Sequence, residues 1–179
     1  MSMICSVLGI TPAQIAAIRR TPALASYLAT HADTAHMGPD GAPGLSSALG
    51  PIGPVFDLQK TWHILHYLFT GDVGPGAPPS DALIAGEELG EDLGYGPPRL
   101  HDVDPTRAFA AFLSLYNLQP RLDLAEMRRA GVYAVPRGAH IGEREEAALR
   151  EDVAVSLEDL RDYVDAVAGK RNGLLIWLS

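Results

Sequence analysis

The residues best placed to do chemistry are two histidines at positions 57–71, in the segment DLQKTWHILHYLFTG. His63 and His66 are three positions apart, and residues at this spacing share one face of a helix. Two imidazoles so placed could hold one zinc ion, but a bound zinc needs a third and usually a fourth ligand. The segment also lacks the HExxH spacing of zinc proteases. We therefore expect no metal site, with His63 and His66 as the candidate ligands if one forms.

The alternative interpretation of this segment is packing. Leu58, Trp62, Leu65 and Phe69 recur at helical spacing, which is typical of the buried face of an amphipathic helix. The two histidines and Tyr67 would then form a polar flank beside the buried stripe. On this interpretation one histidine is half-buried and donates to a backbone carbonyl, while the other lies at the surface.

A second polar segment, GEELGEDLGYGPPRL, occupies positions 86–100 and contains Glu87, Glu88, Asp92 and Tyr95. Its glycines allow backbone conformations closed to other residues and a close approach of other groups. Carboxylates can serve acid–base chemistry only in a pocket that separates their pKa values. The alternative is a solvated acidic loop anchored by Tyr95. No phosphate site is expected, because the carboxylates would repel an anion.

Other catalytic signatures are missing from the sequence. It contains no GxSxG elbow, no Walker loop and no dinucleotide-binding fingerprint. The single cysteine, Cys5, lies in the apolar run MICSVLGI, where we expect a buried thiol that acts as a small hydrophobe. Catalytic residues are therefore unknown at this stage, and no cofactor is expected.

The overall charge excludes some classes of partner. The 179-residue chain has a formal net charge of −8, which disfavours binding to nucleic acid or to anionic membranes. No apolar run reaches the roughly 18 residues that span a bilayer, and the first residues lack the pattern of a signal peptide. We expect a cytoplasmic protein, and the acidity permits a basic protein partner.

The elements that must position these residues begin with an apolar run, Ser2–Ile10, that predicts a buried strand. Thr11 and Pro12 then mark a helix start. A loop rich in glycine and proline follows at about 36–54. Asp57 is the expected N-cap of the histidine helix, and Gly71 its end.

The second half predicts further helices over Thr106–Leu118, Asp123–Ala130 and Glu143–Asp152. Ser156 is the expected start of a separate last helix, and the chain ends in an apolar strand, LLIWL. The two terminal runs match in character and could pair. The prediction is one α+β domain over residues 1–179, mostly helical, with a small sheet that includes both terminal strands.

Three segments together resemble the DUF1877, or YfbM-like, family of bacterial proteins: DLQKTWHILHYLFTG, GEELGEDLGYGPPRL and MRRAGVYAVP. The opening MSMICSVLGITPAQIAAI is similar as well, so the likeness covers nearly the whole chain. The resemblance implies a compact α+β domain in a bacterial cytoplasm and supplies no catalytic residues. It also implies that the histidine helix and the glycine-rich loop act jointly. The cleft between them would be lined by Trp62, His63, His66, Tyr67, Glu87, Glu88, Asp92 and Tyr95.

Three functions remain open from the sequence. The first is a non-enzymatic binding or protein-interaction module, for example one that neutralises a basic partner, and another is a purely structural subunit that associates with itself. The alternative is a small-molecule-binding protein or small enzyme that uses the cleft just described. In that case His66 is the candidate general base or ligand, because histidine titrates near neutral pH.

Overall fold

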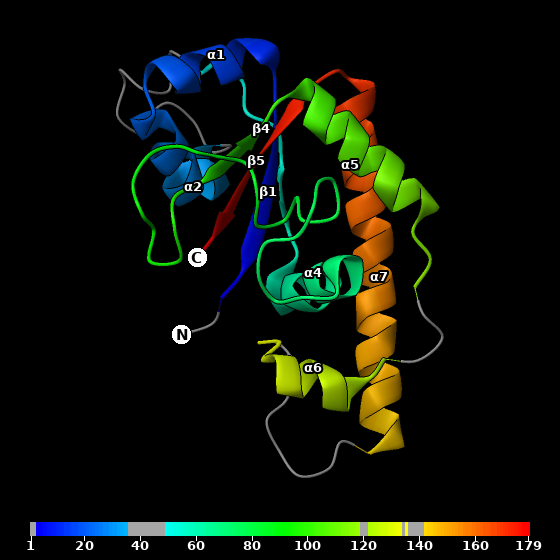
Figure 1. The fold of residues 1–179 in the computed structure, drawn as a ribbon. Helices are drawn as coiled ribbons and strands as arrows, with labels where there is room; N and C mark the ends of the chain where they lie inside the picture. The colour runs from blue at the N-terminus through cyan, green and yellow to red at the C-terminus, as the bar shows by residue number, and fades with distance from the viewer. Residues whose placement is uncertain (1–2, 36–48, 119–121, 134, 136–141) are drawn as a thin grey trace.

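The centre of the fold is the antiparallel pair formed by β1 (Cys5–Ile10) and β5 (Gly173–Leu178). Figure 1 shows the two strands side by side in a computed structural model that describes residues 3–35, 49–118, 122–133, 135 and 142–179. Backbone partners run from Cys5 opposite Leu178 to Ile10 opposite Gly173. The predicted pairing of the two terminal runs is therefore confirmed.

Three short strands complete the sheet on either side of this pair. They are β2 (Val55–Asp57), β3 (Glu87–Glu88) and β4 (Arg99–His101). The described strands form one antiparallel sheet in the order β2-β1-β5-β4-β3. These three strands are too short to show an alternating pattern, and the sequence analysis did not find them.

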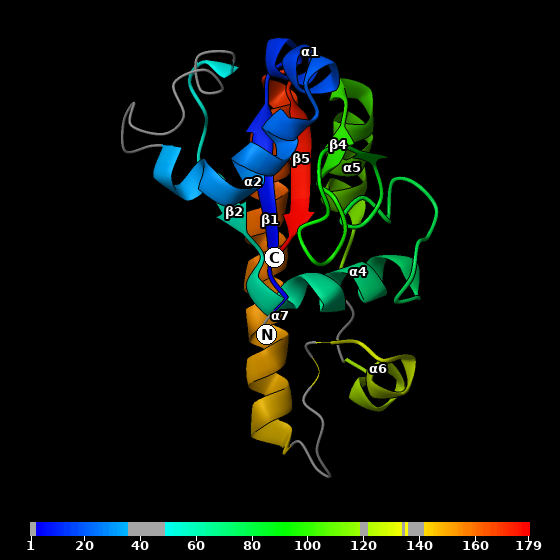
Figure 2. The same ribbon diagram turned by 90° about the vertical axis from the view of Figure 1, so that its left-hand side faces the viewer.

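Helices cover both faces of the sheet (Figures 1 and 2). On one face lie α1 (Pro12–Arg20) and α2 (Ala23–Ala35), and on the other α4 (Trp62–Thr70), α5 (Val103–Leu115) and α7 (Glu143–Gly169), with α6 (Leu124–Ala130) beyond α4. Successive side chains of the central strands point to opposite faces of the sheet, as in any strand. Ile176 joins the cluster under α4, α5 and α7, while Leu175 and Trp177 join the cluster under α1 and α2. The α+β architecture is confirmed.

Several sequence signals act as predicted. The Thr11 hydroxyl accepts from the Gln14 N–H, and the Gln14 side chain accepts from the Thr11 N–H, which closes a capping box at the start of α1. Gly71 ends α4 in the left-handed conformation with φ of 76°. Cys5 is completely buried, and burial raises the pKa of its thiol.

Four predicted helix boundaries are wrong. Asp57 does not cap the histidine helix: it ends β2 and accepts a hydrogen bond from the Ser6 hydroxyl, and a 3-10 turn, η1 (Gln59–Thr61), leads into α4. The helix expected from Thr106 begins at Val103, because Asp102 caps it and proline is tolerated in a first helical turn. It also ends at Leu115, before the predicted Leu118.

The fourth wrong boundary is the break expected at Ser156. α7 runs through it without interruption, since Val153, Leu157 and Leu160 continue a single buried stripe. The serine hydroxyl instead accepts a hydrogen bond from Thr61 at 2.9 Å. The predicted loop at about 36–54 lies mostly outside the described residues, which include only 49–54 of it.

Candidate functional site

Both histidines of α4 are buried, so the expectation that one lies at the surface is wrong. The Nδ1 atom of His63 accepts from the backbone N–H of Tyr133 at 2.9 Å, and its ring stacks on Trp62 with centroids 4.7 Å apart. His66 donates from Nε2 to the carbonyl of Gly74 at 2.9 Å. Its Nδ1 has no partner among the described residues. Burial lowers the pKa of both histidines and keeps them neutral near pH 7.

The other aromatic residues of this helix also have structural contacts. The indole N–H of Trp62 donates to the carbonyl of Met3 at 3.3 Å, and the Tyr67 hydroxyl donates to Glu126 at 3.0 Å. Both side chains belong to the main core cluster. Trp62 and Tyr67 therefore fix α4 against its neighbours.

The acidic glycine-rich loop extends along α2 (Figure 1). The Glu91 N–H donates to the Ser26 hydroxyl at 2.6 Å, and Asp92 folds the loop by accepting from Gly94 and Gly96 at 2.7 and 2.9 Å. Tyr95 is half-buried against the main core cluster. None of the hydrogen bonds of the described residues joins this loop to His63 or His66.

The two glutamates that open this loop lie in β3 and pair with arginines. Glu87 accepts from Arg19 of α1 at 2.7 Å. Glu88 lies 3.6 Å from the Arg99 guanidinium. The first of these pairs forms part of a cavity.

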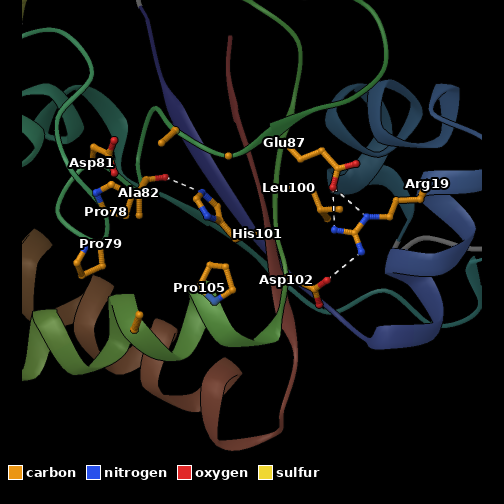
Figure 3. Close-up of a pocket in the computed structure, with 13 residues that line it drawn as sticks. Arg19, Pro78, Pro79, Asp81, Ala82, Glu87, Leu100, His101, Asp102 and Pro105 are labelled. Carbon is orange, nitrogen blue, oxygen red and sulfur yellow. Dashed lines mark hydrogen bonds and ion pairs between the residues drawn. The ribbon is translucent and has the colours of Figure 1, made fainter.

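A cavity of about 470 Å³ opens between β4, α5 and the connection that follows α4, which we name the 71–86 segment. Its size falls within the roughly 300–1,000 Å³ of small-molecule sites. Figure 3 shows Pro78, Pro79 and Ala82 together with Asp81 on one side, and the charged groups around Arg19 on the other. Its walls are formed by Arg19, Pro78, Pro79, Asp81, Ala82, Ala85, Gly86, Glu87, Leu100, His101, Asp102, Pro105 and Ala108.

His101 lies at the back of the cavity and is 8% exposed. Its Nε2 donates to the carbonyl of Ala82 at 2.9 Å (Figure 3), and burial lowers its pKa, so the ring is neutral near pH 7. Only glycine fits at position 86, next to His101. Its φ is 125°, and a Cβ there would lie 3.1 Å from His101 Nε2 and 3.0 Å from the carbonyl oxygen of Leu100.

His66 and His101 thus share one structural role, which is to hold the 71–86 segment in place. His66 holds the start of the 71–86 segment at Gly74, and His101 holds its far part at Ala82. This segment supplies Pro78, Pro79 and Asp81 to the cavity wall. His66 therefore positions the cavity wall without lining the cavity.

At the opposite side, Arg19 bridges Glu87 and Asp102, with its nitrogens 2.7 and 2.9 Å from the two carboxylates (Figure 3). The Val103 N–H and then Arg19 lower the pKa of Asp102. The same aspartate caps α5, so one side chain fixes both a helix start and this side of the cavity.

Of the eight residues predicted to line a cleft, Glu87 alone lines this cavity. The structure brings Trp62, His63 and His66 into one buried cluster and leaves Asp92 and Tyr95 in the loop along α2. Sequence reasoning missed Arg19, Asp81, His101 and Asp102. The helix-start signal at Asp102–Pro105 could have drawn attention to His101, whereas nothing local marks Arg19 or Asp81.

Across the described ranges, no group of three or more His, Cys, Asp or Glu residues is placed to hold a metal ion. In the described part of the chain, no helix combines the length and apolarity needed to cross a bilayer. The cavity offers a partly apolar wall, one neutral histidine and four charged side chains.

The fold and cavity define an α+β protein with helices on both faces of an antiparallel sheet. The sequence model of the family described as "Domain of unknown function (DUF1877)" matches residues 1–177, and the chain belongs to this family. The resemblance found in the sequence is thereby confirmed. A solved structure, "a Protein of Unknown Function YfbM from Escherichia coli", is 18% identical with a TM-score of 0.61.

That alignment covers 98% of this chain and 99% of the E. coli chain. At this level of identity the likeness supports the fold alone. The chain matches none of the curated proteins with which it was compared.

Proposed function

We propose that this protein binds a small organic molecule in the cavity between β4, α5 and the 71–86 segment. The observation that carries the proposal is the combination of size and lining. The cavity has about 470 Å³, prolines and alanines over much of its wall, and a few fixed polar groups. Small-molecule sites typically have this composition, because the apolar wall supplies affinity and the polar groups supply orientation.

Binding without turnover is favoured by the state of the polar groups. His101 already donates to the carbonyl of Ala82 and is neutral, and Arg19 is already paired with two carboxylates. No serine, threonine or cysteine lines the cavity to act as a nucleophile. An enzymatic use of the cavity would have to employ Asp81, the lining carboxylate without an ion pair among the described residues, as its base or nucleophile.

The test uses two matched variants of α5. Ala108 lines the cavity and Ala111 does not, and both are exposed. Ala108→Trp should fill the cavity, whereas Ala111→Trp places the same side chain on the same helix outside it. A fragment collection screened by ligand-observed NMR should give hits with the wild type and Ala111→Trp that disappear with Ala108→Trp. Hits that survive Ala108→Trp, or no hits at all, would overturn the proposal.

The basic protein partner expected from the sequence stays a prediction, and α7 is the place to test it. Its exposed side chains include eight carboxylates and one arginine, Arg144. Neutralising Glu158, Asp159, Asp162 and Asp165 should abolish any salt-sensitive binding of a lysine-rich probe protein. Unchanged binding would remove the support that α7 gives to this prediction.

A further inference from the structure

Asp81 is the residue of the cavity wall that bears most on the chemistry of a ligand. Asp81 lines the cavity and is 5% exposed. Within the residues that the structure describes, its carboxylate makes no hydrogen bond and no ion pair. Most carboxylates of buried residues are paired, so the small part of Asp81 that stays exposed, on a side chain that lines the cavity, is where a partner could reach it. The group that this wall lacks beside Asp81 is therefore a cation.

The neighbouring ionisable groups do not supply that cation. His66 and His101 interact electrostatically with Asp81, but burial lowers the pKa of both and leaves them uncharged near pH 7. Arg19 is bound at the other side of the cavity by Glu87 and Asp102 (Figure 3). The described groups thus leave Asp81 without a positive neighbour.

The charge of the whole wall favours a cation as well. Three carboxylates and one guanidinium line the cavity, so its net charge is −2 while His101 is neutral. An anionic ligand would meet Asp81, Glu87 and Asp102 with only one arginine to offset them. A cation would gain from the same field, chiefly near Asp81, because the side chains of Arg19, Glu87 and Asp102 are 42–45% exposed and water screens their charges.

The rest of the wall is apolar and favours an apolar group in the ligand. Pro78, Pro79 and Pro105 present apolar rings, and Leu100 and Ala108 add aliphatic surface. A ring or short alkyl group of the ligand would remove this surface from water, at roughly 25 cal/mol per Å² of apolar area buried. A molecule that matches this wall is amphipathic, with an apolar body and one charged end.

We propose that the cavity takes a primary amine with a small apolar body, whose ammonium group pairs with Asp81 and whose body packs on the prolines. The inference rests on the proposed small-molecule function and narrows it to one ligand class. It assigns Asp81 as the residue that determines specificity.

Three probes of similar size and different charge test it: 2-phenylethylamine, 2-phenylethanol and 3-phenylpropionate. In isothermal titration at pH 7 the amine should bind at least about tenfold more tightly than the alcohol, the gain expected for one charge-assisted hydrogen bond. The carboxylate should bind most weakly. Equal affinities for the amine and the alcohol would overturn the inference and leave the proposed function standing.

Two variants sharpen the result. Asp81→Asn should lower the affinity for the amine about tenfold and leave that for the alcohol unchanged. Glu158→Gln removes the same charge from the exposed side of α7 and should change neither. If the amine does not bind to the wild type, the inference fails, while the proposed function is decided by the fragment screen with Ala108→Trp and Ala111→Trp.

A measurement without any ligand gives a second, independent readout. Because Asp81 has no partner to lose, Asp81→Asn should keep or raise the thermal midpoint of the unliganded protein. A clear fall in the midpoint would show that the carboxylate has a structural role, and it would overturn its assignment to the ligand.

Discussion

At the scale of single residues, the buried histidines make stability depend on pH. Burial lowers the pKa of His63, His66 and His101 in the folded chain, whereas in the unfolded chain they titrate near 6.5. Unfolding therefore takes up protons below that pH, and acid favours the unfolded state. The stability that neutral histidines contribute is fully present above about pH 6.5 and is lost as the pH falls through the lowered pKa values.

We expect His66→Gln to show this in urea unfolding between pH 7.5 and 5. The variant should be less stable than the wild type at pH 7.5, because the hydrogen bond to Gly74 is changed. Its stability should also fall less steeply as the pH decreases. Val155→Ala, at an exposed position of α7, serves as the control because it removes no titratable group, and it should keep the wild-type slope. Parallel slopes for His66→Gln and the wild type would contradict the assignment.

Residue types alone predict some of these roles and not others. The burial of Cys5 and the helix end at Gly71 follow from local sequence, because an apolar run and a glycine after a helical stripe act locally. The contact of Arg19 with Glu87 and Asp102 does not. It joins positions distant in the sequence, and each is an ordinary exposed charge until the sheet brings α1 beside β3 and β4.

At the scale of elements, α7 is the longest of the described helices that pack on the sheet. Its buried stripe packs on α5 and on the central strands, and Leu160 within it is completely buried. Leu160→Ala should lower the free energy of unfolding by about 2–5 kcal/mol, through lost apolar burial and the cavity left behind. Chemical denaturation with circular dichroism measures the change.

Val155 provides the matched control on the same helix. Its side chain is 54% exposed, so Val155→Ala should change the free energy of unfolding by no more than about 0.5 kcal/mol. Similar losses for the two variants would mean that the face of α7 is misassigned. The comparison also tests the continuous helix, which the sequence analysis divided at Ser156.

That division shows what local signals lack at this scale. Serine in front of an acidic turn is typical of a helix start, yet serine is also tolerated inside a helix when its hydroxyl finds a partner. Thr61 supplies that partner from another part of the chain. The register of the buried stripe across Val153, Leu157 and Leu160 is the better guide, since it continues through the serine.

At the scale of the whole molecule, hydrogen bonding is most complete in the central strands. β1 and β5 each have a strand on both sides, whereas β2 and β3 lie at the edges. We expect the amides of β1 and β5 to exchange with solvent most slowly, near the rate set by global unfolding. Hydrogen exchange followed by mass spectrometry or NMR measures this. Equal protection of Glu87–Glu88 and of Cys5–Ile10 would contradict the expected hierarchy.

The global architecture was easier to predict than the site. Two apolar runs of similar length, separated by helical patterns, indicate an α+β fold with paired terminal strands, and the structure confirms it. The cavity is built from single residues of α1, β3, β4, α5 and the 71–86 segment. No spacing in the sequence relates these residues, because their proximity arises only when the sheet order places β4 beside β5.

The pairing of β1 with β5 also bears on how the chain folds. Residues 5 and 178 become partners, so the sheet cannot close until nearly all of the intervening chain has been brought together. Contacts between distant positions slow folding, because the entropy of closing a long loop is lost before the contact is gained. β4 carries His101 and docks on β5, so the ligand cavity can be completed only after this late step. A ligand added during refolding should therefore leave the rate of the main folding phase unchanged and slow only unfolding.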